Sequence, residues 1–221
     1  MNRNLLILQM LLFYSCISMP MHKYEIENST NKLNLSNKSL KILFFEDLRK
    51  GENVNKNLLA FIPFFISGRT ELNFPEHDEI SINTPFKFFI ADIFENEISS
   101  MFSLKKLIVT NDSTLPTDYT IHGAINKSYC ERRLYTYGLS MYGVLLWYLG
   151  VPAMAHECDF ELKIFLVDSK KSALFSKTYQ EKKTIYAGLY YNLNNLNRIY
   201  TDILRNIMKE IKTDLRANLK N

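Results

Sequence analysis

The sequence contains few of the residues that mark fibrous, disordered or disulfide-rich chains. Its 221 residues include 7 glycines, 6 prolines, 3 cysteines and 1 tryptophan. The scarcity of glycine and proline argues against a fibrous or disordered protein, and 47% hydrophobic residues suffice for a folded domain with a sizeable core. The net charge is only +4 and the basic residues are scattered, so we expect no nucleic-acid surface.

Short catalytic motifs are also missing. The chain has no G-x-S-x-G, no phosphate-binding G-x-x-x-x-G-K-[S/T], no H-E-x-x-H and no G-x-G-x-x-G. We therefore assign no catalytic residue, no metal site and no cofactor from the sequence. An enzyme with an unfamiliar site is kept as an alternative, because a missing motif does not exclude new chemistry.

What is present begins at the N-terminus, which has the pattern of an export signal. "MNRN" supplies one positive charge, "LLILQMLLFY" is a ten-residue apolar run, and Ser15 precedes Cys16. We predict a signal peptide over residues 1–15 and lipidation of Cys16, although Phe13 and Tyr14 depart from the usual lipobox. Cleavage by the ordinary signal peptidase and an uncleaved anchor are the alternatives. The Asn- and Ser-rich residues 16–40 then form a lipidated N-terminus and polar tether.

The remaining residues, 41–219, are expected to form a single α+β domain. Alternating or continuous apolar runs predict strands at 41–49, 104–111, 118–130, 159–168 and 173–183. Apolar residues at three-to-four spacing predict helices at 84–103 and 194–219. Residues 50–83 form a long connection in which Pro63 interrupts an apolar stretch. The fold class is therefore a mixed sheet of about five strands with two helices packed on one face, plus an apolar insert between strands.

Two amphipathic patterns define the expected core most clearly. In the segment at 159–168, Phe160, Leu162, Ile164 and Leu166 should face inward and Glu161 outward. The last helix carries a stripe of apolar residues at Leu196, Ile199, Ile203, Ile207, Ile211 and Leu215.

The apolar insert at residues 137–155 has no charged side chain and is long enough to cross a bilayer as a helix. A span would put the flanking strands in different compartments, so we favour a hairpin of those strands with an insert that does not span the membrane. The insert then either packs on its own domain or contacts lipid or a partner. The candidate contact residues are Tyr137, Tyr142, Trp147, Tyr148 and Leu149, with the preceding Arg132 and Arg133 near lipid phosphates.

Cys130 and Cys158 bracket the insert and could form a disulfide in an oxidising compartment. Cys130 is in step with His122, whereas Cys158 is in step with the inward-facing Phe160. A regular hairpin would therefore not bridge them without a bulge, and two separate buried thiols is the alternative. His122, His156 and Cys158 lack the spacing of a metal site. Asp47 and Arg49 predict a salt bridge rather than a catalytic pair.

The order of elements and two short motifs resemble a known family. "KILFFEDLR", where an apolar strand ends in Asp47-x-Arg49, and the later strand "DYTIHGAI" are similar to the amino-terminal domain of the Tol-system translocation protein. The curli-secretion lipoprotein and the penicillin-binding-protein activator lipoproteins share that domain type. "YGLSMYGVLLWYLGVP" with the downstream "GLYYN" also resembles uncharacterised bacterial envelope lipoproteins.

The resemblance implies a non-catalytic adaptor or scaffold in a bacterial envelope complex. Ile17 after the cysteine is not the aspartate that retains some lipoproteins in the inner membrane, so the resemblance implies a periplasm-facing, lipid-anchored protein of the outer membrane. The expected partners are the membrane and an envelope protein. The alternatives are a lipid-handling or transport-accessory module, with the insert and "LLAFIPFFISG" lining a groove, and an enzyme with an unrecognised site.

Overall fold

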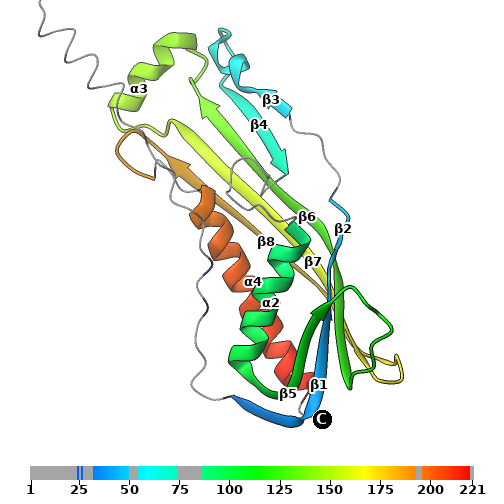
Figure 1. The fold of residues 1–221 in the computed structure, drawn as a ribbon. Helices are drawn as coiled ribbons and strands as arrows, with labels where there is room; N and C mark the ends of the chain where they lie inside the picture. Colours follow the sequence, from blue (N-terminus) through cyan, green and yellow to red (C-terminus); the bar gives the residue numbers. More distant parts are fainter. Residues whose placement is uncertain are drawn as a thin grey trace, which may run out of the picture.

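A single eight-stranded mixed sheet dominates the protein (Figure 1). The computed structural model describes residues 24, 26, 32–49, 54–73, 86–192 and 196–219. The strands are β1 (Leu33–Leu43), β2 (Glu46–Asp47), β3 (Val54–Lys56), β4 (Ser67–Asn73), β5 (Phe102–Thr110), β6 (Tyr119–Tyr135), β7 (Met154–Asp168) and β8 (Ala173–Ala187). The helices are α2 (Phe86–Met101), α3 (Val144–Tyr148) and α4 (Leu196–Leu219), with 3-10 turns η1 (Asn57–Phe61) and η2 (Ser140–Gly143).

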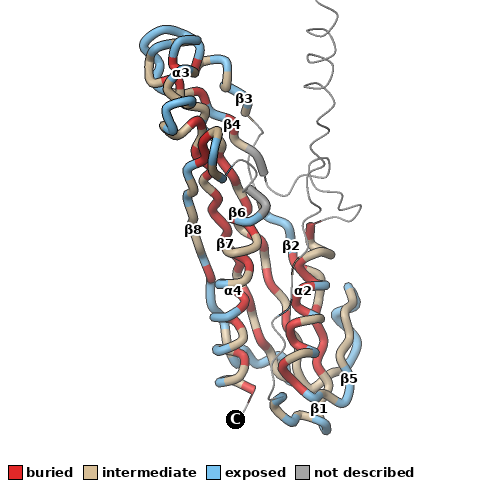
Figure 2. The backbone as a smooth tube through the Cα atoms, turned by 90° about the vertical axis from the view of Figure 1, so that its left-hand side faces the viewer, coloured by how far each residue is buried: buried red, intermediate tan, exposed pale blue. Residues whose placement is uncertain are grey.

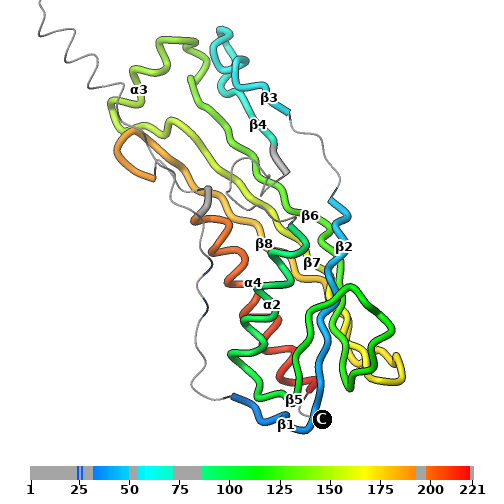
Figure 3. The backbone as a smooth tube through the Cα atoms, in the orientation of Figure 1, coloured from blue at the N-terminus to red at the C-terminus, as the bar shows by residue number. Residues whose placement is uncertain are grey.

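Strand β6 is the central strand of the sheet. Its 17 residues extend over roughly 55 Å at about 3.3 Å per residue. On one side it pairs with β7, which pairs with β8 to complete an antiparallel meander. On its other side, β1 and β2 pair in parallel with the first half of β6, and β4 pairs antiparallel with the second half. At one end of the molecule η1 joins β3 to the returning β4, and η2 with α3 joins β6 to the returning β7 (Figure 3).

Helices α2 and α4 lie on one face of the sheet, with α2 over β5 and β1 and α4 over β8 and β7 (Figure 1). The inward side chains predicted on β7 are confirmed, since Phe160, Leu162, Ile164 and Leu166 are all buried. They pack against the predicted stripe of α4, of which Ile199, Ile203, Ile207, Ile211 and Leu215 are buried. The alternation of β7 and the helical period of α4 therefore place these residues in one core.

The predicted count of about five strands and two helices is wrong, because the sheet has eight strands and the described residues form three helices. Three of the missed strands, β2, β3 and β4, are short or lie in the connection that Pro63 had marked as irregular. The missed helix, α3, is a five-residue turn within the insert. Thr84 and Pro85, the expected start of the first helix, and Cys16 lie outside the described residues.

The predicted tether also reaches too far. Residues 33–40, assigned to it from their Asn- and Ser-rich composition, form most of β1 and pair with β5. The error has a simple cause, since most of this stretch is only partly buried and its outer residues are exposed. A polar edge of a sheet and a polar linker have the same composition.

A β-bulge at Asn126 lets the two cysteines meet. Ile125 pairs with Leu162 and Lys127 with Glu161, so Asn126 is an extra residue on β6. The extra residue reverses the alternation of β6 relative to β7 beyond this point. Cys130 and Cys158 then stand directly opposite each other, with a Cα–Cα distance of 4.1 Å, and form a disulfide.

Two buried charged side chains fasten other parts of the domain. The Lys41 ammonium group donates to three backbone carbonyls of the connection between β5 and β6, those of Asp112, Ser113 and Leu115, at 2.8–3.3 Å. On the helical face, Glu97 of α2 accepts hydrogen bonds from Lys212 of α4 at 2.9 Å and from the Tyr24 hydroxyl at 2.7 Å. Glu97 therefore ties both helices to the segment that precedes β1.

The disulfide is expected to contribute to stability chiefly by restricting the unfolded chain. Cys130 and Cys158 are 28 residues apart, so replacing both by alanine should lower the free energy of unfolding by roughly 3–4 kcal/mol. Urea unfolding of the wild type, with and without a reductant, and of the double variant measures this. The reductant should destabilise the wild type and leave the double variant unchanged; an equal effect on both proteins would contradict the assignment.

Candidate functional site

Exposed apolar side chains gather at one end of the elongated domain. Among the described residues, all the exposed large hydrophobic side chains except Ile26, Leu48, Leu115 and Leu174 belong to three segments at this end. We call residues 57–66, 137–152 and 186–191 together the apolar tip. Its exposed members are Leu58, Phe61, Ile62, Phe64, Phe65, Ile66, Leu139, Met141, Tyr142, Leu145, Tyr148, Leu149, Tyr186 and Tyr190. Figure 2 shows this end largely exposed, in contrast to the buried lower sheet.

Backbone hydrogen bonds join the first two segments of the tip. The Phe64 amide donates to the Gly138 carbonyl at 3.0 Å. The amides of Thr136 and Tyr137 both donate to the Ile66 carbonyl, at 3.1 and 2.9 Å. The Thr136 and Ser140 hydroxyls donate to carbonyls of η1. The tip is thus one hydrogen-bonded unit rather than three independent loops.

Two glycines allow these segments to approach so closely. A Cβ at Gly143 would lie 1.9 Å from the Thr136 carbonyl oxygen, and one at Gly68 would lie 2.3 Å from the Asn57 carbonyl oxygen. Both obstacles are backbone atoms, which cannot move aside as a flexible side chain can. Glycine at these positions therefore sets η2 against the end of β6 and η1 against the start of β4.

The third segment joins through tyrosine hydroxyls. Tyr190 donates to the Tyr148 carbonyl at 3.2 Å and Tyr191 donates to the Gly150 carbonyl at 3.3 Å. Within the insert, the Trp147 indole donates to the Tyr135 carbonyl at 2.8 Å, and the Tyr137 hydroxyl donates to the Pro152 carbonyl. Many polar side chains of the tip thus hydrogen-bond to backbone within this end of the domain.

Phe64 is held in an unfavourable conformation. Its φ is +70°, in the left-handed region, yet its side chain is 93% exposed. A non-glycine residue in this region costs roughly 1–2 kcal/mol. A ring in water returns almost none of that cost through burial, so folding alone does not explain a phenylalanine here. The conformation instead leaves an aromatic ring exposed to solvent.

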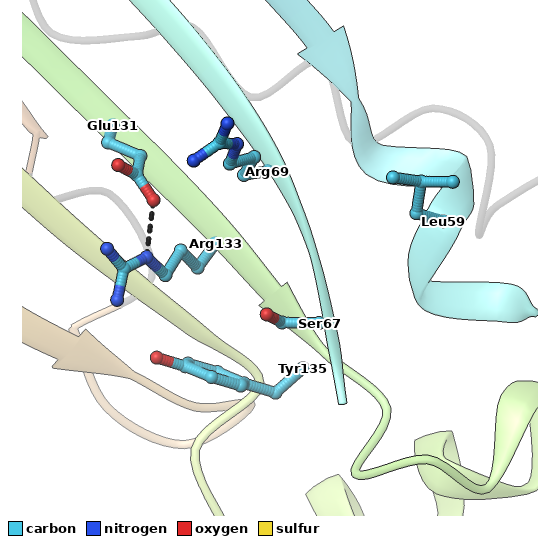
Figure 4. Close-up of a pocket in the computed structure, with 6 residues that line it drawn as sticks. All are labelled: Leu59, Ser67, Arg69, Glu131, Arg133 and Tyr135. Carbon is cyan, nitrogen blue, oxygen red and sulfur yellow. Dashed lines mark hydrogen bonds and ion pairs between the residues drawn. The ribbon is translucent and has the colours of Figure 1, made fainter. Parts of the chain in front are cut away.

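A polar cavity lies beside the tip on the sheet face opposite the helices (Figure 4). Its volume is about 290 Å³ and its lining residues are Leu59, Ser67, Arg69, Glu131, Arg133 and Tyr135. Arg133 forms an ion pair with the Glu131 carboxylate, and this hydrogen bond raises the pKa of the Arg133 guanidinium. Arg69 pairs with Glu71 at 3.1 Å. The cavity thus contains paired charges and no exposed nucleophile–base pair.

The two predicted head-group arginines point to opposite faces of the sheet. Arg133 is exposed beside the cavity, whereas Arg132 lies directly across from His156 on the helical face. His156 is 3% exposed, and neither ring nitrogen has a hydrogen-bond partner among the described residues. Burial and the positive charge of Arg132 lower the pKa of His156 to about 4, so its imidazole is neutral at pH 7.

The remaining sequence candidates do not converge. His122 stacks on Phe165, which lies nine residues along β7 from His156, or about 30 Å away. Asp47 and Arg49 form a two-bond ion pair at 2.7 and 2.8 Å; burial opposes the change, but Arg49 lowers the Asp47 pKa. In the part of the chain that is described, no three His, Cys, Asp or Glu side chains are grouped to hold a metal ion.

The structure divides the predicted contact residues into two groups. Tyr142, Tyr148 and Leu149 are exposed on the tip, whereas Tyr137 and Trp147 are half-buried and hydrogen-bonded within it. The site list from the sequence omitted residues 58–66 and Tyr186 and Tyr190. The absence of any charge in "NLLAFIPFFISG" and "TIYAGLYYN" is the signal that could have found them.

Asparagine at position 64 should stabilise the protein. Asn tolerates the left-handed region better than Phe, and the exposed ring contributes little burial, so Phe64→Asn should raise the free energy of unfolding by about 0.5–1 kcal/mol. Urea unfolding measures the change. Phe65→Asn is the matched control, because Phe65 is exposed but has no positive φ, and it should bring no gain. A loss of more than about 1 kcal/mol for Phe64→Asn would show that the ring supports the fold.

The buried His156 predicts a pH effect on stability. Its pKa is about 4 in the folded protein and 6.5 when unfolded, so the unfolded chain binds the proton more tightly. The contribution of neutral His156 to the free energy of unfolding is therefore fully present above pH 6.5. It is lost as the pH falls towards 4, by up to about 3 kcal/mol. The free energy of unfolding, measured between pH 4 and 7, should fall more steeply with decreasing pH in the wild type than in His156→Leu. Parallel pH profiles of the two proteins would contradict the burial of a neutral imidazole.

Comparisons with known proteins identify no family for this chain. The chain matches no protein-family model, and no curated protein matches it. None of the helices described is long and apolar enough to cross a membrane. Neither comparison indicates a function, so the functional assignment rests on the geometry of the tip.

Proposed function

We propose that this protein is an exported, lipid-anchored and non-catalytic adaptor of a bacterial envelope, which docks through its apolar tip. The observation that carries the proposal is the concentration of exposed apolar side chains at one end of the domain. Soluble monomers rarely expose large contiguous apolar patches, and such patches usually mark interaction sites. The location of this docking, the bacterial envelope, is supported by the export signal, Cys16 and the resemblance to envelope lipoproteins.

The chemistry of the described side chains favours an adaptor over an enzyme. Each acidic side chain around the cavity is held by a cation, as in Glu131–Arg133 and Glu71–Arg69. His156 is buried away from the cavity on the other face of the sheet. A general base needs a free lone pair within reach of a substrate, and neither arrangement offers one.

The alternative of a lipid-handling module gains less support. It requires the insert and "LLAFIPFFISG" to line an apolar groove that encloses a lipid. The structure brings those two segments together, but their large side chains are exposed, with Leu58 at 80% and Leu149 at 78%. The adjoining cavity of about 290 Å³ is lined by charged and polar groups, with Leu59 as its aliphatic member. Acyl chains would find few partners there.

The adaptor role predicts that tip and anchor matter in the cell and that the chemistry candidates do not. In cells that lack the protein, Leu145→Asp with Leu149→Asp should fail to restore the wild-type phenotype, and so should Cys16→Ala. Asp47→Asn, His122→Gln and the surface control Leu174→Asp should restore it. The intact mass of the mature protein should show a chain that begins at an acylated residue 16.

Two results would overturn the proposal. An unmodified N-terminus on a cytosolic protein would exclude the anchored role. Full complementation by the tip variant, together with loss of function in His122→Gln or Asp47→Asn, would favour an enzyme. Immunoblotting for wild-type protein levels separates these outcomes from a variant that fails to fold.

A further inference from the structure

We infer that the apolar tip inserts into the interfacial layer of a phospholipid bilayer. This inference rests on the proposed docking function and names its partner as a lipid surface rather than a second protein. Three features of the tip point to lipid: polar groups that are satisfied internally, a collar of basic side chains, and exposed tyrosines.

The first feature is that the tip has turned its hydrogen-bonding groups inward. Backbone amides of Phe64, Thr136 and Tyr137 are paired across segments, and the hydroxyls of Tyr190 and Tyr191 donate to carbonyls of the insert. A protein interface typically forms about one hydrogen bond per 100–200 Å² with its partner. A hydrocarbon layer offers no such partners, so a surface that enters it must satisfy its polar groups internally.

The second feature is charge complementarity with lipid phosphates. The uncharged stretch 57–68 is bounded by Lys56 and Arg69. The uncharged stretch 134–155 is preceded by Arg133, and the third stretch, from residue 184, is preceded by Lys183. Arg69 pairs with Glu71, Arg133 with Glu131 and Lys183 with Asp202. Glu157, two residues beyond the second stretch, pairs with Lys182 at 2.7 Å. Basic side chains, most of them in ion pairs with carboxylates, therefore surround the tip at the level where phosphates lie when apolar side chains are inserted.

The third feature is the exposure of the tyrosines. Tyr142, Tyr148, Tyr186 and Tyr190 are all more than half exposed. Tyrosine concentrates at membrane–water interfaces because its ring is apolar and its hydroxyl remains hydrated. The side chains with no polar atom, such as Leu58, Phe64 and Leu149, are the most exposed of the tip at 78–93%.

The geometry limits how deeply the tip can enter. Helix α3 has five residues and is about 7.5 Å long, far below the thickness of a bilayer core. The charged collar also stops entry where the strands begin. The tip is therefore expected to bury its side chains about 5–10 Å into one leaflet, as interfacial elements do.

The decisive experiment uses the one tryptophan of the chain, Trp147, which lies in the tip. The mature chain, residues 16–221, carries Cys16→Ser to remove the lipid and retains every described residue. It is titrated with vesicles of phosphatidylethanolamine and phosphatidylglycerol (3:1) and with vesicles of phosphatidylcholine alone. We expect a blue shift of Trp147 emission, quenching by brominated acyl chains, and flotation with vesicles, all stronger for the anionic lipid.

Variants assign the binding to the tip. Leu149→Asp and Leu145→Asp should each weaken vesicle binding at least tenfold, because each puts a charge where an apolar side chain would be buried. Phe64→Asn should weaken it severalfold without loss of stability. Leu174→Asp is the matched control, since this exposed leucine lies at the opposite end of β8, and it should bind as the wild type does.

Several results would overturn the inference. Failure of the wild type to float with either vesicle would do so, and so would unchanged Trp147 emission in protein that floats. Equal binding by Leu149→Asp, with loss of all binding in high salt, would place the contact on the charged strands. Failure of vesicle binding together with loss of complementation by the tip variant would assign the tip to a protein partner. In that case the adaptor role would stand and the lipid assignment would fall.

Discussion

The bulge at Asn126 determines what the far end of this protein presents. It adds one residue to β6 between Ile125 and Lys127, and the Asn126 side chain fixes the position by donating to Glu161 at 2.8 Å. Below it, odd-numbered residues of β6 face the helices; above it, even-numbered residues do. Without the extra residue, Arg133 would turn to the buried face and Arg132 to the exposed face. The disulfide and the arrangement of charges beneath the tip both depend on that single insertion.

The tip lies beyond the helical layer and depends on the sheet for its shape. Strands β6, β7 and β8 continue past α2 and α4, and the Cys130–Cys158 disulfide joins two of them below the insert (Figure 1). Short elements such as η1 and α3 bury too few side chains to fold alone. The strand ends supply carbonyls and amides, as with Tyr135 and Thr136, to which the tip segments bind. The ends of these strands thus hold the apolar loops in a conformation that the loops would not keep in water on their own.

Sequence periodicity predicted the parts of the fold that are buried on one face. The alternation around Ile164 and the stripe around Ile203 identified the core, because these patterns follow from strand and helix geometry alone. The first residues of β1 escaped prediction because an exposed strand edge has the composition of a linker. The bulge at Asn126 escaped because alternation is continuous on each side of it. No short sequence pattern indicates the change of register at this position.

The tip shows the same limit for function. Its insert was identified from its lack of charge, but two further segments join it from 42 and 79 residues away along the chain, and only the folded sheet brings them together. The side chains that the sequence assigned to one contact surface also separate into an exposed group and a half-buried group. Trp147 and Tyr137 turn inward to hydrogen-bond, and Phe64, from another segment, is the most exposed aromatic ring among the described residues.

An anchor at Cys16 would change the affinity that the tip needs. Tyr24, which is bound to Glu97, comes eight positions after Cys16, and at about 3.5 Å per position this segment reaches roughly 28 Å at most. A lipidated chain would therefore hold the helical face close to the bilayer. Tethering raises the local concentration of lipid around the tip, so a contact that is weak in solution becomes a stable second attachment. A small apolar tip, too short to span a membrane, is sufficient for a domain that is held in this way.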